Sequence, residues 1–162
     1  MDSRELVPAT KWIARVRDAL RRGEFPPFRV NHKFDIPYLG GYSVDGRTIY
    51  LDRRLPDMFR MGTHHANLGE FVTVHERVEK WFLDTYHSAY LRAHRIATAM
   101  EHQAVREAGL DPVKYEAALR PYIRRCDDET VKRVPVDLDL TPYEDEDDRR
   151  ILSELMRAEG ER

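Results

Sequence analysis

The stretch from Phe71 to Val105 reads FVTVHERVEKWFLDTYHSAYLRAHRIATAMEHQAV and contains the pattern His75-Glu76-x-x-Glu79. On a helix with about 100° per residue, Glu79 lies about 40° from His75, and apolar side chains share their face. These apolar residues are Leu68, Phe71, Val72, Val78 and Phe82. We therefore expect an imidazole and a carboxylate in the middle of a buried face, where polar groups need partners.

The segment that follows has a similar face, centred on His94. Within about 60° of His94 on a helix lie another histidine, a glutamate, a tyrosine, a threonine and three apolar side chains. They are His87, Tyr90, Leu91, Ala97, Thr98, Glu101 and Val105. Two consecutive helices are thus expected to turn histidine and glutamate side chains toward each other.

The composition is typical of a globular protein, with 162 residues of which 41% are hydrophobic and 35% charged. This length is sufficient for one domain with its own core. We expect a single domain over residues 1–162, with a core at 28–126. An N-terminal helix at 10–22 precedes this core, and an acidic C-terminal extension at 127–162 follows it.

Charge and cysteine content exclude several classes of protein. The formal net charge of -2 argues against a broad nucleic-acid-binding surface. A single cysteine, Cys126, excludes an intramolecular disulfide and a cysteine-rich zinc site. No signal sequence is recognisable, and no apolar run approaches the roughly 18 residues of a membrane span. We therefore expect a cytoplasmic protein without a membrane segment, and its oligomeric state stays open.

The sequence predicts an α+β fold that is mostly helical, with a small antiparallel sheet packed on the pair of His/Glu helices. Helices are predicted over residues 10–22 and 68–83, from a new start at Asp84-Thr85 to Ala108, and from Asp111-Pro112 onward. Strands are predicted over residues 28–34 and 47–53, with a turn at 44–46, a loop at 57–67 and an edge strand at 134–140. A last helix is predicted from the capping sequence at Thr141.

The spacing of His75 and Glu79 is typical of a metal site. A metal-binding HExxH helix places two imidazoles one turn apart, with the intervening glutamate as general base. Here Glu79 replaces the second histidine, and a carboxylate at this spacing can reach the same ion. Because catalytic zinc sites commonly combine two histidines with one carboxylate, a further histidine is expected, and His94 is the candidate.

Glu101 is the alternative third ligand. It lies roughly 10 Å from His94 along a helix, so one ion is not expected to be held by both. With His75, Glu79 and His94, a zinc complex keeps a charge of about +1, whereas Glu101 in place of His94 would bring it to about zero and weaken the Lewis acid. We therefore expect His94 as ligand and Glu101 as the group that orients a ligand imidazole. His87 is a further candidate for this orienting role or for a ligand.

With these features the sequence resembles the zincin metallopeptidases from Arg47 to Glu101, about a third of the chain. The resemblance lies in the strand RTIYLDR, a loop, the helix with His75-Glu76-x-x-Glu79, and a following helix with a third ligand. It implies a zinc-dependent hydrolase of a peptide or amide bond, in which His75 binds the metal and Glu76 is the base. It also implies that the strand lines the substrate groove. Glu79 stands where the family has histidine.

Other interpretations of the same residues remain open. Tyr86 and Tyr90 can donate a hydrogen bond to an oxyanion or serve in aromatic packing. The His/Glu residues can form a buried network in a non-catalytic interaction or assembly protein, such as an accessory or phage-type component. A hydrolase predicts an open cleft between strand 47–53 and Glu76, whereas this alternative predicts a filled space. A di-iron site is disfavoured because the sequence lacks Glu-x-x-His motifs.

Overall fold

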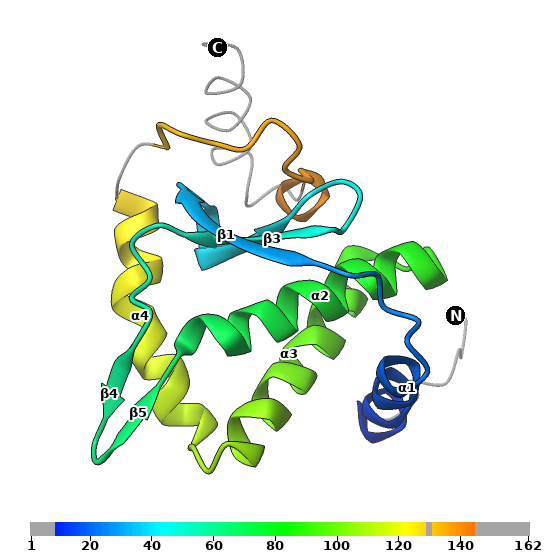
Figure 1. Cartoon of the computed structure of the whole chain (residues 1–162), viewed down its shortest axis with the longest axis horizontal. Coiled ribbons are helices and arrows are strands. Elements are labelled where there is room, and N and C mark those ends of the chain that lie inside the picture. The colour runs from blue at the N-terminus through cyan, green and yellow to red at the C-terminus, as the bar shows by residue number, and fades with distance from the viewer. Residues whose placement is uncertain (1–8, 129–130, 145–162) are drawn as a thin grey trace, which may run out of the picture.

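A computed structural model describes residues 9–128 and 131–144 (Figure 1). The helices are α1 (Ala9–Arg21), α2 (Leu68–Tyr86), α3 (Tyr90–Glu107) and α4 (Pro112–Asp128). The strands are β1 (Arg29–Phe34), β2 (Gly40–Tyr42), β3 (Thr48–Asp52), β4 (Phe59–Met61) and β5 (His64–Ala66), with 3₁₀ turns η1 (Pro37–Leu39) and η2 (Thr141–Tyr143). The fold is therefore α+β and mostly helical, as predicted. Within the described residues, no helix is long and apolar enough to cross a membrane.

Helix α2 organises the core because it buries side chains on two sides. Phe82 packs with Trp12 and other residues of α1 and α3 in one buried cluster. Leu68 and Val72 pack in another cluster with Ile49 of the sheet. Figure 1 shows the sheet above α2, with α3 and α1 on the other side and α4 at one end. The apolar face predicted for this helix is thus covered from both directions.

The sheet has the strand order β1-β3-β2 and is mixed. β2 and β3 form an antiparallel hairpin around the turn predicted at 44–46, where Gly46 has a φ of 70°, although no strand was predicted at β2. β1 pairs with β3 in parallel, so the expectation of an antiparallel sheet is wrong for this strand. The turn sequence at 44–46 determines only that β2 and β3 are antiparallel to each other. The direction of β1 depends on η1, which reverses the chain between β1 and β2.

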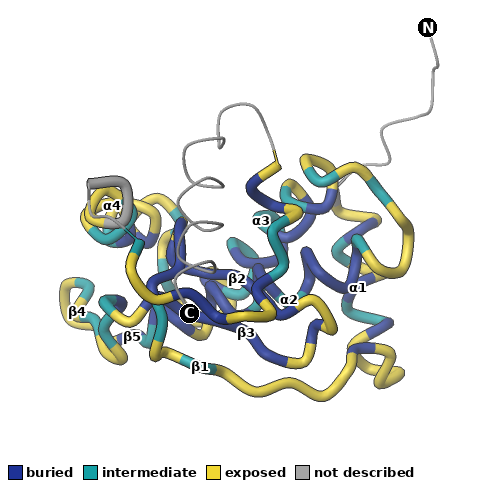
Figure 2. The backbone as a smooth tube through the Cα atoms, turned by 90° about the horizontal axis from the view of Figure 1, so that it is seen from above, coloured by how far each residue is buried: buried dark blue, intermediate teal, exposed yellow. Residues whose placement is uncertain are grey.

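Strand β1 lies at an exposed edge of the sheet. In the strand predicted at 28–34, the apolar side chains of Phe28 and Val30 are 38% and 41% exposed. The Phe28 ring lies under the guanidinium of Arg77, and Phe34 packs on Tyr50. Figure 2 shows burial concentrated in β2, β3 and α2, while β1 and the β4–β5 hairpin are largely exposed. Helix α2, which carries His75, Glu76 and Glu79, therefore lies in the most buried part of the fold.

The segment 57–67, predicted as a loop, contains the antiparallel hairpin of β4 and β5. Each of these strands has only 3 residues, too few for an alternating pattern to be detected. His64 and His65 are exposed on β5. This hairpin was missed because its strands carry almost no sequence signal.

The helix break predicted at Asp84-Thr85 is wrong, because α2 continues to Tyr86. The exposed Asp84 forms an ion pair of 3.0 Å with Lys80 one turn earlier, which supports the helix. His87 caps the end of α2 in a left-handed conformation with a φ of 47°. Its N–H donates a hydrogen bond to the carbonyl of Leu83. His87 therefore does not lie on the face of α3.

Residues 131–144, from the predicted acidic extension, pack on the sheet. A buried cluster forms there from Ile36, Tyr50, Val134, Leu138 and Tyr143. The edge strand predicted at 134–140 is absent among these described residues, where an isolated bridge joins Leu138 to Ser43. Pro135 lacks an N–H and accepts a hydrogen bond from Leu138 in a turn, which prevents a regular ladder. The predicted last helix begins as η2 and otherwise lies outside the described residues.

Candidate metal centre

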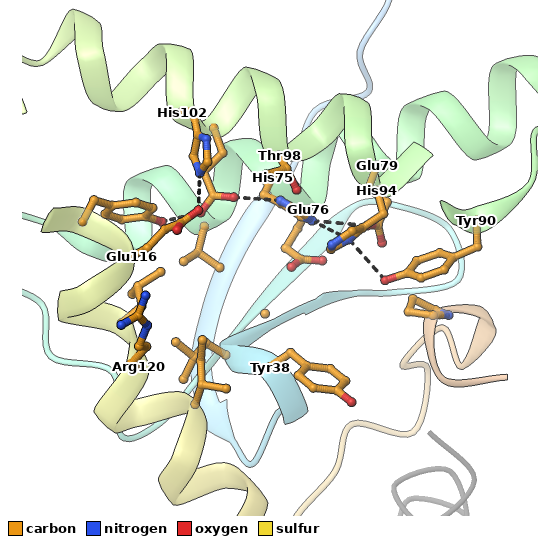
Figure 3. A pocket seen from close by; sticks show the side chains of 18 of the residues that line it. Tyr38, His75, Glu76, Glu79, Tyr90, His94, Thr98, His102, Glu116 and Arg120 are labelled. Atoms are coloured by element: carbon orange, nitrogen blue, oxygen red, sulfur yellow. Dashed lines mark hydrogen bonds and ion pairs between the residues drawn. The ribbon is translucent and has the colours of Figure 1, made fainter. Parts of the chain in front are cut away.

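Three side chains from α2 and α3 meet at one point (Figure 3). His75 and Glu79 lie one turn apart on α2, and His94 faces them from α3. Nε2 of His75 is 3.2 Å from Oε2 of Glu79 and 3.2 Å from Nδ1 of His94. That Nδ1 is 2.9 Å from the same Oε2. The three atoms form a nearly equilateral triangle, which we call the His/Glu triangle.

The His/Glu triangle has the dimensions and the donor set of a tetrahedral zinc site. Ligand atoms at about 2.0–2.1 Å from a tetrahedral ion lie about 3.3 Å from one another, close to the separations in the triangle. Two imidazole nitrogens and one carboxylate oxygen are a common donor set for catalytic zinc, which keeps a further position for water or substrate. His75, Glu79 and His94 therefore fit a zinc ion in size and in chemistry.

Glu101 lies on the opposite side of the His75 ring. Nδ1 of His75 donates to Oε2 of Glu101 at 2.8 Å, and Tyr115 donates its hydroxyl to the other oxygen. This network assigns a proton to Nδ1, so that Nε2 is the nitrogen directed toward Glu79 and His94. Glu101 thus has the position of a group that orients an imidazole, and His94 has the position of a third ligand.

The His/Glu triangle favours positive charge. Its three atoms are all potential acceptors, and their lone pairs repel unless a proton or a cation lies between them. Burial by itself lowers the pKa of His75, but the hydrogen bonds with Glu101 and Glu79 raise it well above its ordinary value. Burial by itself raises the pKa of Glu79, but the hydrogen bonds with His75 and His94 bring it below its ordinary value. A divalent cation would satisfy all three atoms at once.

Tyr42, on the edge strand β2, holds Glu79 from the side opposite the triangle. Its hydroxyl is buried and donates to Oε1 of Glu79 at 2.9 Å. Because Oε1 is engaged in this way, Oε2 is directed toward His75 and His94. Hydrogen bonds of this kind orient metal ligands and raise metal affinity.

The substitution Tyr42→Phe is expected to weaken zinc binding by about tenfold or more, because it removes the hydroxyl that orients Glu79. Zinc affinity is measured by competition with a chromogenic chelator at constant pH. Tyr122→Phe is the matched control, since Tyr122 is a half-buried tyrosine on α4 that contacts Phe59. Equal zinc affinity in Tyr42→Phe and the wild type would contradict the orienting role of Tyr42.

Glu76 is buried beside the His/Glu triangle and contributes to the lining of a cleft. Among the described residues, none forms a hydrogen bond or ion pair with its carboxylate. A Cβ at Gly40 would lie 2.5 Å from Oε1 of Glu76, so a larger residue at position 40 would displace this carboxylate. Burial raises the pKa of Glu76; His75 opposes this rise and Glu79 reinforces it. The carboxylate of Glu76 is therefore unpaired among the described residues and accepts a proton more readily than an exposed glutamate does.

A cleft of about 580 Å³ lies over Glu76 and the His/Glu triangle. Its rim at Tyr38 and Leu39 has φ values of 57° and 74°, a left-handed conformation that is costly for residues other than glycine. Tyr38 stacks on Tyr143, which comes from η2. The groove strand expected at 47–53 is the central strand β3, and none of its residues is among the described residues that line the cleft. Gly40 of the edge strand β2 takes that position.

The remaining predicted site residues are not all close to the His/Glu triangle. The Tyr90 hydroxyl lies 3.4 Å from Nδ1 of His94, and Tyr90 lines the cleft. Tyr86 packs against Trp12 of α1, which is the aromatic packing considered for it. His87 is exposed at the end of α2, because that helix is longer than predicted.

Tyr42, Tyr115 and Gly40 are site residues that the sequence did not reveal. Tyr115 fits the apolar stripe of α4, and its contact with Glu101 depends on how α3 and α4 pack. Tyr42 lies in a segment without an alternating pattern. The pair Gly40-Gly41 was the one available signal, because glycines beside a strand often mark a close approach of another group.

Comparisons of the chain with protein-family models, with curated proteins and with solved structures found no match. The case for a functional site therefore depends on the geometry of the residues themselves. That geometry consists of the His/Glu triangle, the orienting carboxylate of Glu101, and the carboxylate of Glu76 in a cleft.

Proposed function

We propose that the protein is a zinc-dependent hydrolase of zincin type that cleaves a peptide or amide bond. One observation carries the proposal: the ligand atoms of His75, Glu79 and His94 lie within 3.2 Å of one another beside an open cleft. Glu101 fixes the ring of His75 so that Nε2 is directed toward the other two. A purely structural network would not require this convergence of acceptors next to a cleft.

Each group of the site has a part in hydrolysis. When bound, zinc supplies a Lewis acid that polarises a carbonyl group and acidifies water. Glu76 lies where it can accept a proton from the attacking water and return it to the leaving amine. The hydroxyl of Tyr90, beside His94, can donate a hydrogen bond to the negative charge that develops on the carbonyl oxygen.

The groove strand that the zincin resemblance implied at 47–53 does not line the cleft, and β2 takes its place. In that family a strand before the active-site helix lines the substrate groove. Here the strand next to Glu76 is β2, which is antiparallel to β3 and lies at the edge of the sheet. The ligand set would be that of a zincin in permuted order, with the carboxylate at Glu79 and the second histidine at His94.

The alternative of a non-catalytic assembly protein predicts a filled space between strand 47–53 and Glu76, and no described residue of that strand lines a cleft there. The cleft of about 580 Å³ over Glu76 nevertheless favours the hydrolase. A filled space would leave the carboxylate of Glu76 without access to a substrate.

The proposal is tested with a mixture of peptides from a digested proteome, analysed by mass spectrometry. The zinc-loaded protein is expected to cleave a subset of these peptides, to lose this activity on treatment with a chelator, and to regain it when zinc is restored. The His75→Ala variant, treated in the same way, serves to exclude a contaminating protease. The absence of cleavage by the zinc-loaded protein, or cleavage that is indifferent to the chelator, would overturn the proposal.

A further inference from the structure

We propose that Arg120 binds a carboxylate of the substrate, so that the hydrolase prefers acidic peptide-like substrates. This inference rests on the proposed function, because it assigns the same cleft a substrate class. Arg120 lies on α4 and lines the cleft that contains His75 and Glu76. Figure 3 shows Arg120 and Glu116 at one end of this cleft and Tyr90 at the other, with the His/Glu triangle between them.

Helix α4 connects the metal centre to Arg120. Its cleft-lining residues are Tyr115, Glu116, Leu119, Arg120 and Ile123. Tyr115 donates its hydroxyl to Glu101, which in turn accepts from His75, so this end of α4 adjoins the centre. Arg120 follows Tyr115 by about 7.5 Å along the helix axis. A substrate held at the His/Glu triangle can therefore extend along α4 to the guanidinium of Arg120.

The acidic side chain one turn before Arg120 on α4 is already paired. Glu116, one turn earlier on α4, would be the usual partner of an arginine at this spacing. Instead, Oε1 of Glu116 lies 2.7 Å from Nε2 of His102 on α3. Within the part of the chain that the structure describes, Arg120 forms no hydrogen bond or ion pair, and no other arginine or lysine lines the cleft. Its guanidinium, with five N–H donors, is thus available to a ligand.

Among the described residues that line the cleft, Arg120 is the only arginine or lysine, and Glu76 is the only carboxylate without a hydrogen-bond or ion-pair partner. Glu101 is paired with His75, and Glu79 would be neutralised by the metal ion. Arg120 is itself exposed, and the buried Leu119 and Val72 contribute apolar wall to the same cleft. A planar carboxylate matches the paired donors of a guanidinium.

The test uses two series of zinc-binding hydroxamates with alkyl chains of increasing length. One series ends in a carboxylate and the other in a neutral carboxamide. Calorimetry on the zinc-loaded wild type is expected to show about tenfold tighter binding of the acid at one chain length. Arg120→Gln should remove this preference and Arg120→Glu should invert it. Arg124→Gln, an exposed arginine one turn later on α4 that does not line the cleft, should retain it.

Each outcome decides between the two proposals. Equal binding of acid and amide to the wild type, or a preference that persists in Arg120→Gln, would overturn the role of Arg120 and leave the hydrolase intact. Failure of both series to bind the zinc-loaded wild type would overturn the hydrolase and the carboxylate subsite together. A preference that disappears in Arg120→Gln and remains in Arg124→Gln supports the subsite.

Discussion

Replacement of Glu76 by glutamine is expected to lower kcat by about 10²–10⁴-fold, the contribution of a general base. The amide cannot accept a proton from the attacking water, although it has nearly the size of the carboxylate. Glu76 contributes no atom to the His/Glu triangle, so the variant should bind as much zinc as the wild type. Cleavage of a peptide identified from the mixture is measured together with the zinc content of the same sample.

Glu70→Gln is the matched control, because Glu70 is an exposed glutamate in the first turn of the same helix. This control should have wild-type kcat and wild-type zinc content. A Glu76→Gln variant that binds zinc and cleaves peptides at the wild-type rate would exclude Glu76 as the base. Loss of zinc in that variant would instead point to a role in the metal centre.

Replacement of Phe82 by alanine is expected to lower the free energy of unfolding by about 3–5 kcal/mol. The Phe82 side chain is 0% exposed, and its ring centroid lies 4.9 Å from that of Trp12 and 4.7 Å from that of Tyr86. Alanine would leave a cavity where α1, α2 and α3 meet. Urea denaturation followed by circular dichroism measures the loss, and Tm should fall by roughly 10 °C.

Val113→Ala serves as the control for this prediction. Val113 is 71% exposed on α4, so its truncation should change the free energy of unfolding by no more than about 0.5 kcal/mol. A loss below about 1 kcal/mol in Phe82→Ala would mean that the contact of α1 with α2 is not as tightly packed as described.

The local part of the site could be predicted from the sequence because helix periodicity is a local property. The period of α2 places His75 and Glu79 on one face, and the period of α3 places His94 and Glu101 on another. The expectation that these faces oppose each other agrees with the distances between the three ligand atoms. The net charge of the zinc complex then favoured His94 over Glu101 as the expected third ligand.

The parts that depend on contacts between distant segments could not be predicted. The direction of β1 depends on the path of η1, and the hydrogen bond from Tyr42 to Glu79 joins residues far apart in the chain. His87 was misplaced for a different reason. The pair of Lys80 with Asp84 supports α2 beyond the predicted break, so His87 became a helix cap.

Elemental analysis of the purified protein measures whether His75, Glu79 and His94 bind zinc. We expect about one zinc ion per chain in the wild type, and its loss in both His75→Ala and His94→Ala. His102→Ala, from the same cleft but outside the His/Glu triangle, should keep the metal. Loss in His75→Ala with retention in His94→Ala would assign the third ligand to Glu101. A wild-type protein that holds no metal even after zinc is added would exclude a zinc site at these three residues.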